Sequence, residues 1–346
     1  RNGAKVLALA SHIPSRQIGS KFFQETHPEA IFQECSGYCE MVNSAEQGGV
    51  VLHHAIQSTM AGNGVSVLVI PGDVSMQDAE DDSFVESKIS AGRPVVFPDP
   101  AEAAALTQAI NEAKSVTLFV GAGVKDAREQ VLKLAEKIKA PIGHALGGKM
   151  YIQYENPFDV GMNGLLGYGA AHEATHEADL LILLGTDFPY NDFLPDANVA
   201  QVDINGSHIG RRTKISYPVT GDVAATIENI LPHVDEKKDR SFLDKMLKKH
   251  YGKLEHVVEA YTSNVDKHTP IHPEYIADLI DRNADEDAIF TVDTGMCNVW
   301  GARYITANGK REQIGSFRHG TMANALPQAL GAQAANPGRQ VITFSG

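Results

Sequence analysis

The 346-residue sequence has few cysteines, a deficit of basic residues and no long apolar run. Its three cysteines, Cys35, Cys39 and Cys297, are too few for a disulfide framework, and we expect small buried hydrophobic residues in a reducing compartment. The 30 basic and 43 acidic residues give a net charge of −13, which argues against nucleic acid as a main partner because phosphates would be repelled. No apolar segment approaches the ~20 residues that cross a bilayer.

The remaining composition is that of a globular protein, with 43% hydrophobic and 21% charged residues. At roughly 150 residues per domain, the length predicts two or three domains. The sequence begins without methionine, shows no signal peptide and closes on the strand-like segment QVITFSG. We therefore expect an internal piece of a longer protein.

Short apolar runs alternate with helical patterns, which predicts α/β domains with doubly wound parallel sheets. Ligands of such sheets bind beyond the carboxyl ends of the strands, where several of these runs end in Gly or Asp. The predicted strands cover residues 6–11, 65–72, 115–123, 141–146, 178–185, 198–205, 288–295 and 340–346. The predicted helices cover residues 101–114, 126–140, 223–231, 273–283 and 323–335.

Two segments without a clear hydrophobic period divide the chain. The first is acidic and then proline-rich, and the second is highly charged and predicts a surface helix. We predict the C-terminal part of one domain at 1–82, a linker at 83–100, a complete middle domain at 101–234, a linking helix at 235–268 and the start of a third domain at 269–346.

The string HEATH at residues 172–176 matches the H-E-x-x-H pattern, in which two histidines bind zinc and Glu173 serves as the base. The predicted helix is very short, because residues 177–180 lead directly into a buried strand. The glycine of the extended zinc-protease motif is also absent. We therefore favour an exposed helix and predict no metal ligands here.

The middle domain holds several candidates for contact with a nucleotide. Gly121 and Gly123 join a strand to a helix, but Asp126 replaces the third glycine of the dinucleotide pattern, so a non-standard nucleotide contact and a tight structural turn both stay open. Asp203 ends a strand and could accept hydrogen bonds from a ribose or cap a turn, whereas Asp222 is first of all a helix N-cap. Together these residues favour a nucleotide-like cofactor.

The sequence resembles the thiamine-diphosphate- and FAD-dependent pyruvate oxidase family, most of all its bacterial pyruvate:quinone dehydrogenase type. Acetolactate synthases share the same layout. The resemblance runs along the whole chain. The strings that carry it are SHIPSRQIGSKFFQETHPE (11–29), LVIPGDV (68–74), KIKAPIGHALGGK (137–149), YENPFDVGMNGLLG (154–167), LLGTDFPY (183–190), QVDIN (201–205) and GSFRHGTMANALPQALGAQAA (315–335).

The resemblance implies three α/β domains, which bind the thiamine pyrimidine, FAD and the thiamine pyrophosphate in that order. It places Phe23 and Gln24 on the substrate side of the thiazolium. Gly320, Thr321 and Met322 would clasp thiamine diphosphate, with Met322 bending it, and Gly295 would lie near the pyrophosphate. The residues implied to contact FAD are Asn163, Gly164, Leu165, Leu166, Thr186, Asp187, Phe188, Pro189, Tyr190, Asp203, Asp222 and Val223.

The implied reaction is oxidative decarboxylation of pyruvate to acetate and carbon dioxide, with electrons passed through FAD to a quinone. The implied cofactors are FAD, thiamine diphosphate and Mg²⁺. An acetolactate synthase-like carboligase with structural FAD and a non-catalytic FAD-binding module are the alternatives. The family also implies at least a homodimer, or a homotetramer, in the cytoplasm or at the inner face of the cell membrane.

The sequence departs from the family at both ends. It has no counterpart of the glutamate that activates thiamine, and the Gly-Asp-Gly metal loop would begin only at Gly346. The C-terminal segment with which the quinone type attaches to membranes has no counterpart either. We therefore expect this piece to be inactive alone but able to bind FAD, and expect thiamine diphosphate and Mg²⁺ to bind only in the full-length protein.

Overall fold

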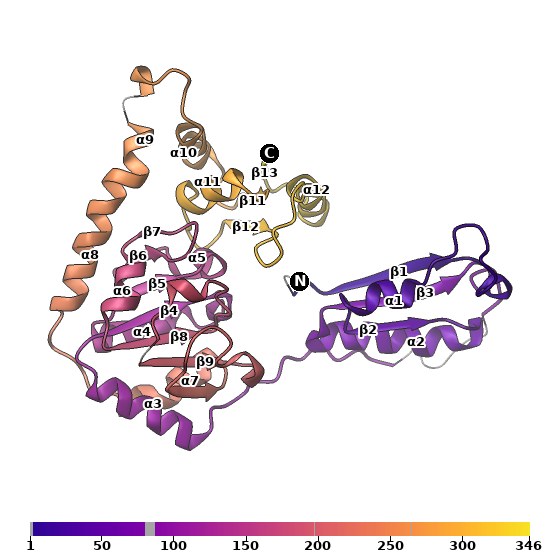
Figure 1. Cartoon of the computed structure of the whole chain (residues 1–346), viewed down its shortest axis with the longest axis horizontal. Coiled ribbons are helices and arrows are strands. Elements are labelled where there is room, and N and C mark those ends of the chain that lie inside the picture. The colour runs from indigo at the N-terminus through magenta and orange to yellow at the C-terminus, as the bar shows by residue number, and fades with distance from the viewer. Residues whose placement is uncertain (1–2, 80–86, 197, 264) are drawn as a thin grey trace. The chain divides into compact units, whose positions relative to one another are not determined.

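The computed structural model describes residues 3–79, 87–196, 198–263 and 265–346 (Figure 1). It divides into two compact units, Arg1–Pro94 and Val95–Gly346. Part of the predicted linker, residues 83–86, lies outside the described residues. The other predicted domain boundaries stay predictions.

The first unit contains a three-stranded parallel sheet with the order β1-β3-β2. Ser44 begins the main helix by accepting a hydrogen bond from the backbone of Gln47, as an N-cap does. Val51 and Ala55 of that helix are buried against Leu68 of the central strand. The elements are β1 (Val6–His12), η1 (Ser15–Gln17), α1 (Pro28–Gln33), β2 (Tyr38–Met41), α2 (Ala45–Ser58), η2 (Thr59–Asn63) and β3 (Val65–Pro71).

The second unit is built on a seven-stranded sheet with the order β10-β9-β8-β4-β5-β6-β7. All neighbouring strands are parallel except β7, which runs antiparallel to β6. The carboxyl ends of the parallel strands therefore share one edge of the sheet. The strands are β4 (Val116–Val120), β5 (Ile142–His144), β6 (Asp159–Met162), β7 (Tyr168–Gly169), β8 (Leu180–Leu184), β9 (Val199–Asp203) and β10 (Tyr217–Thr220).

Both faces of this sheet are buried, because alternate side chains of each strand join different cores. Leu118 and Ile182 pack with helices α3, α4 and α7, whereas Phe119 and Leu183 pack on the other face with Phe188. The remaining elements are α3 (Pro100–Glu112), η4 (Ala122–Val124), α4 (Arg128–Ile138), α5 (Leu146–Ile152), α6 (Ala171–Glu177), η5 (Asn191–Phe193), η6 (Gly206–His208), α7 (Val223–Ile230) and η7 (Leu231–His233).

The chain continues through a long helix, α8, which contacts β6 and β7, into a small parallel sheet with the order β12-β11-β13 (Figure 1). Gly301 of helix α11 packs closely on this sheet, because a Cβ there would lie 2.8 Å from Val292 Cγ1. The elements are α8 (Ser241–Leu254), η8 (Glu255–Glu259), α9 (Ala260–Thr262), η9 (Val265–Lys267), α10 (Pro273–Asn283), β11 (Ile289–Val292), α11 (Met296–Tyr304), β12 (Glu312–Gly315), α12 (Ala325–Ala335) and β13 (Val341–Phe344).

The α/β fold with parallel sheets is confirmed. Every strand predicted from an apolar run is present, as β1, β3, β4, β5, β8, β9, β11 and β13, and the five predicted helices are α3, α4, α7, α10 and α12. The sequence did not predict the short strands β2, β6, β7, β10 and β12, nor the helices α1, α2, α5 and α11. Burial of the cysteines is confirmed for Cys297 but wrong for Cys35, which is exposed, and Cys39 is half-buried. None of the described helices is long and apolar enough to span a membrane.

Replacing Gly301 by alanine should destabilise the Val95–Gly346 unit. The new methyl group would lie 2.7 Å from Gln313 Nε2 and 2.8 Å from Val292 Cγ1, an overlap that costs about 1–3 kcal/mol and outweighs the gain of about 0.5–1 kcal/mol in helix propensity. Urea unfolding followed by the fluorescence of Trp300, the single tryptophan, measures the effect.

The matched control is Gly331→Ala in α12, where a Cβ would have no neighbour within 4 Å. This variant should gain about 0.5–1 kcal/mol of helix propensity without any steric cost. Equal effects of the two substitutions would show that Gly301 does not pack as tightly as described.

Candidate functional site

The loops after β4 and β8 meet backbone to backbone at the carboxyl edge of the seven-stranded sheet. A Cβ on Gly121 would lie 2.5 Å from Thr186 Cβ, and one on Gly123 would lie 2.7 Å from Gly185 Cα. The backbone N–H of Gly123 donates to Gly185 O (2.9 Å), and that of Gly121 donates to Leu184 O (3.1 Å). Both glycines are thus required by loop packing, and neither N–H group is free for a phosphate. Their role in cofactor binding stays a prediction.

The structure brings together the two segments that the resemblance assigns to the flavin. Gly164 has a left-handed backbone (φ +104°), and a Cβ there would lie 3.0 Å from the ring of Tyr190 and 3.1 Å from that of Phe188. Asn163 holds the turn, because its side-chain oxygen accepts a hydrogen bond from the Gly164 N–H (2.8 Å). The two loops therefore form one continuous surface at the sheet edge.

Only some of these side chains reach the surface. Leu165 is 66% exposed, whereas Phe188 is 4% exposed and packs edge-to-face on Phe119 with the ring centroids 5.1 Å apart. Phe188 therefore supports the surface from below, and Leu165 is available to a ligand. Pro189 is also exposed, Leu166, Asp187 and Tyr190 are half-buried, and Asn163, Thr186 and Val223 are buried.

Two carboxylates of the predicted set accept hydrogen bonds from backbone N–H groups of the chain. Asp222 is the N-cap of α7, as predicted, and accepts hydrogen bonds from Ala224 N (2.9 Å) and Ala225 N (3.2 Å). Asp203 accepts a hydrogen bond from Asn205 N (2.9 Å), which corresponds to the turn-capping alternative. Neither observation excludes a ligand from the second carboxylate oxygen.

Two basic side chains near these loops were not anticipated from the sequence. Arg212 Nε lies 3.2 Å from Asp187 Oδ1 in the loop after β8. His208 Nδ1 lies 3.5 Å from Asp203 Oδ1 at the end of β9. Their only signal in the sequence is a cluster of basic residues after β9, which has no spacing typical of a binding motif.

Asp293, at the carboxyl end of β11, organises the loops of the small sheet. Its buried Oδ1 accepts hydrogen bonds from Asn324 N (2.7 Å) and Ala325 N (3.0 Å), and its Oδ2 accepts from Ser345 Oγ (3.0 Å) and Gly346 N (3.3 Å). These bonds, with that from Ala325 the strongest, lower the pKa of the Asp293 carboxyl below its usual range. The carboxylate thus joins β11 to the loops before α12 and after β13.

The residues predicted to clasp thiamine diphosphate lie beside this aspartate. Thr294 Oγ1 donates a hydrogen bond to Thr321 O (2.9 Å), which joins the loop after β11 to the loop before α12. Gly295 and Gly320 have left-handed backbones (φ +109° and +68°), and Met322 is 77% exposed. An exposed methionine beside two glycine turns leaves apolar surface for a ring to cover.

Phe23 and Gln24 belong to the Arg1–Pro94 unit. Phe23 is 78% exposed, and Gln24 has a left-handed backbone (φ +62°). The turn is held by Glu25, whose carboxylate accepts hydrogen bonds from Gly19 N and Phe22 N, and these bonds, led by that from Gly19, lower its pKa. The predicted side chains are therefore presented on an internally braced loop.

Helix α11 attaches the small sheet to the seven-stranded sheet through two basic side chains. Lys149, on α5, is fully buried and donates hydrogen bonds to Ile305 O and to Gly301 O (3.3 Å) at the carboxyl end of α11. Arg303, on α11, donates from Nε to Leu166 O (3.3 Å) and from Nη2 to Gly167 O (3.1 Å). Neither contact was anticipated, because the partners are backbone carbonyls more than 130 residues away.

A cluster of buried titratable groups surrounds Lys149. Burial lowers the pKa of Lys149 to about 7 and that of His144 to about 3, and it raises the pKa of Asp159 to about 7. His144 Nε2 lies 3.7 Å from Asp159 Oδ1. Asp281, the other carboxylate near Lys149, is paired with Arg311 (2.7 Å). The interior beneath loop 163–167 therefore favours the uncharged forms of Lys149, His144 and Asp159.

The HEATH segment forms the short helix α6, as expected, and its acidic residues bind lysines. Glu173 pairs with Lys253 of α8 through Oε1. The described part of the chain contains no group of three or more potential metal ligands. Glu177 pairs with Lys245 (2.6 Å) and Lys249 (2.6 Å) of the same helix.

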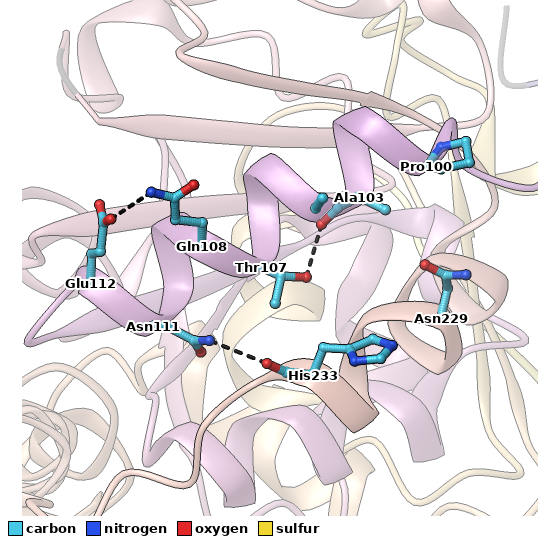
Figure 2. A pocket seen from close by; sticks show the side chains of 9 residues that line it. Pro100, Ala103, Thr107, Gln108, Asn111, Glu112, Asn229 and His233 are labelled. Carbon is cyan, nitrogen blue, oxygen red and sulfur yellow. Dashed lines mark hydrogen bonds between the residues drawn. The ribbon is translucent and has the colours of Figure 1, made fainter.

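A separate cavity of about 560 Å³ lies between α3 and the segment formed by α7 and η7 (Figure 2). Its lining contains none of the predicted site residues. The Asn111 side chain, on α3, points toward His233, and its amide donates to His233 O (3.2 Å). The lining residues are Pro100, Ala103, Ala104, Thr107, Gln108, Asn111, Glu112, Asn229 and His233.

The fold and these loops define a multidomain α/β protein with its candidate ligand sites at the carboxyl edges of parallel sheets. Residues 103–230 match the central domain of thiamine pyrophosphate enzymes. Residues 293–346 match their C-terminal domain, which binds thiamine pyrophosphate. The chain therefore carries two domains of the thiamine pyrophosphate enzyme family.

Three curated relatives illustrate the similarity. An uncharacterized 42.6 kDa protein of Pseudomonas amyloderamosa is 46% identical over 73% of this chain and 64% of its own length. The "Putative thiamine pyrophosphate-containing protein YdaP" of Bacillus subtilis is 31% identical over 100% of this chain and 60% of its own length. An acetolactate synthase of Mycobacterium bovis is 28% identical over 99% of this chain and 57% of its own length. The chain thus spans about three fifths of the length of these relatives.

Replacing Lys149 by methionine should remove a pH dependence of stability. Because the pKa of Lys149 is about 7 in the folded chain and 10.5 ordinarily, the unfolded chain binds more protons between these values, and wild-type stability rises with pH there. We expect Lys149 to contribute a rise of about 2 kcal/mol between pH 7.5 and 9, at about 1.4 kcal/mol per pH unit. Lys149→Met should lack this rise.

Urea unfolding followed by Trp300 fluorescence at the two pH values measures the difference. Lys133→Met is the control, because the side chain of Lys133 is 64% exposed. The same pH dependence in wild type and Lys149→Met would show that Lys149 keeps its charge in the folded chain.

Proposed function

We propose that the protein containing this chain is a thiamine diphosphate-dependent enzyme that decarboxylates pyruvate and oxidises the product to acetate, with FAD and then a quinone as electron acceptors. Membership of the thiamine pyrophosphate enzyme family supports the thiamine cofactor. The observation that carries the flavin part is the meeting of Gly164 with Phe188 and Tyr190, which unites two separate loops into one surface.

The loops of the small sheet fit one end of thiamine diphosphate. Gly295 and Gly320 would approach the diphosphate, because a Cβ at Gly295 would have no neighbour within 4 Å and the loop there is open. The exposed Met322 would support the rings. Thiamine diphosphate, when bound, supplies the carbanion that attacks a 2-keto acid, and FAD supplies a two-electron acceptor.

The carboxyl edge of the seven-stranded sheet fits a flavin nucleotide in part. Leu165 and Tyr190 offer apolar contact, and the carboxylate of Asp203 offers an acceptor for ribose hydroxyls. The turn at Gly121 and Gly123 does not fit a phosphate, since its N–H groups donate to backbone carbonyls. The phosphates of a flavin nucleotide would have to be held by other groups of this edge.

The residues described here do not form a magnesium site. Both carboxylate oxygens of Asp293 already accept hydrogen bonds from backbone and side-chain donors of the chain. Mg²⁺ therefore enters the proposal only as a partner of the diphosphate in the intact protein.

On the substrate side, we assign two roles to the braced loop of the first unit. Phe23 would exclude water from the reacting carbon, which strengthens electrostatic contacts there. Gln24 would orient the carboxylate of pyruvate by donating a hydrogen bond.

We further propose that the protein acts in the cytoplasm or at the inner face of the membrane, and as a homodimer or homotetramer.

A second candidate is an acetolactate synthase-like carboligase in which FAD is structural. It is favoured by the similarity to the acetolactate synthase of Mycobacterium bovis along 99% of this chain.

The two candidates differ in their products. The intact natural protein, supplied with pyruvate, thiamine diphosphate, Mg²⁺ and FAD, should reduce a quinone-like dye and release acetate. Acetolactate without dye reduction would establish the carboligase, and neither product would leave a non-catalytic module.

Introducing a carboxylate at Leu165 should weaken flavin binding. The side chain is 66% exposed, so Leu165→Asp should leave the fold intact while placing a charge on the proposed flavin surface. We expect FAD to bind at least about tenfold more weakly, which corresponds to about 1.4 kcal/mol. Quenching of FAD fluorescence on titration with the chain measures the affinity.

Leu330→Asp is the matched control, because Leu330 is also 66% exposed but lies on α12. Its affinity for FAD should equal that of the unmodified chain. If both variants bind FAD alike, or if the unmodified chain binds none, the proposed flavin surface is wrong.

A further inference from the structure

Helix α11 begins at the proposed thiamine site and ends against the proposed flavin site. It starts at Met296, directly after Gly295, whose carbonyl accepts a hydrogen bond from Asn298 N (3.1 Å). Its 9 residues span about 13 Å. A single short helix therefore runs from the loop after β11 to loop 163–167.

At its carboxyl end, α11 is fixed to loop 163–167 by a two-point contact. Arg303 donates from Nε to Leu166 O (3.3 Å) and from Nη2 to Gly167 O (3.1 Å). Because a guanidinium is planar, two donors on one side fix both the position and the orientation of two successive peptide groups. The loop cannot rotate without breaking at least one of these bonds.

The same helix end is held from below by Lys149. This fully buried amine faces two acceptors, Gly301 O and Ile305 O, and an uncharged amine has two hydrogens to donate. His144, Asp159 and Asp281 are the other titratable groups near it. Lys149 thereby satisfies helix carbonyls that have no partner within the helix.

Helix α11 is packed so closely on both sides that it has no room to slide along either sheet. On one side a Cβ at Gly301 would lie 2.8 Å from Val292 in β11. On the other side the fully buried Ala302 packs with Met162 and Tyr168, which flank loop 163–167. Small residues on both sides bring the helix backbone close to both sheets.

We propose that α11 is a rigid link between the two proposed cofactor sites, and that Arg303 and Lys149 are the positioning residues that fix it. The roles of the two sites rest on the proposed function, whereas the link itself rests on the contacts above. Ordering one loop by a ligand then stabilises the other through α11, and such coupling is reciprocal.

Hydrogen exchange of the intact natural protein, followed by mass spectrometry, tests the link. In the absence of ligands, Arg303→Met should exchange at least about fivefold faster than wild type in peptides covering 163–167, with loop 186–190 unchanged. Arg303→Lys, which keeps one donor, should fall between the two. Arg282→Met is the control, because Arg282 lies on α10 and pairs with Asp278.

Addition of thiamine diphosphate with Mg²⁺ tests the coupling. In wild type we expect slower exchange at 293–295 and also at 163–167, and in Arg303→Met only at 293–295. Protection of 163–167 that persists in Arg303→Met, or unchanged ligand-free exchange in that variant, overturns the link. Absence of any protection at 293–295 in wild type instead contradicts the proposed function, while the ligand-free comparison still decides on the link.

Discussion

The attachment of the small sheet to the seven-stranded sheet depends on how the carboxyl end of α11 is satisfied. The last carbonyls of a helix have no partner within the helix, and leaving them unpaired in a dry interior costs roughly 1–3 kcal/mol each. Lys149 supplies the missing donors from α5, at the expense of its own charge. The placement of the small sheet against the seven-stranded sheet thus depends on one buried amine and on the surfaces that pack around it.

Close backbone contact is the second constraint, and it explains the glycines better than ligand binding does. Gly121 and Gly123 lie where the loops after β4 and β8 touch, and the backbone of Gly185 occupies the space that their side chains would need. The same sequence pattern serves phosphate binding in other proteins. Here the loops first have to fit each other, and the surface that we propose for a flavin is formed by Leu165 and Tyr190 instead.

The sequence predicted what depends on local patterns and missed what depends on distant partners. Apolar runs identified most of the longer strands, and Asp222 was recognised as a helix cap because its partners are two and three residues away. The missed strands have only two to four residues each, too few to show a hydrophobic period. Arg303 and Lys149 bind main-chain carbonyls, which have no side-chain signature, so only the folded chain reveals them.

Helix α8 is held against α6 by a row of ion pairs, in which Glu173 and Glu177 face Lys245, Lys249 and Lys253. These pairs are partly open to water, and dissolved salt weakens the attraction between such exposed charges. The apolar contacts of Met246 beneath them carry no charge, so this screening does not weaken them. The strength with which α8 is held against α6 therefore depends on the salt concentration, whereas screening leaves the apolar packing beneath it unchanged.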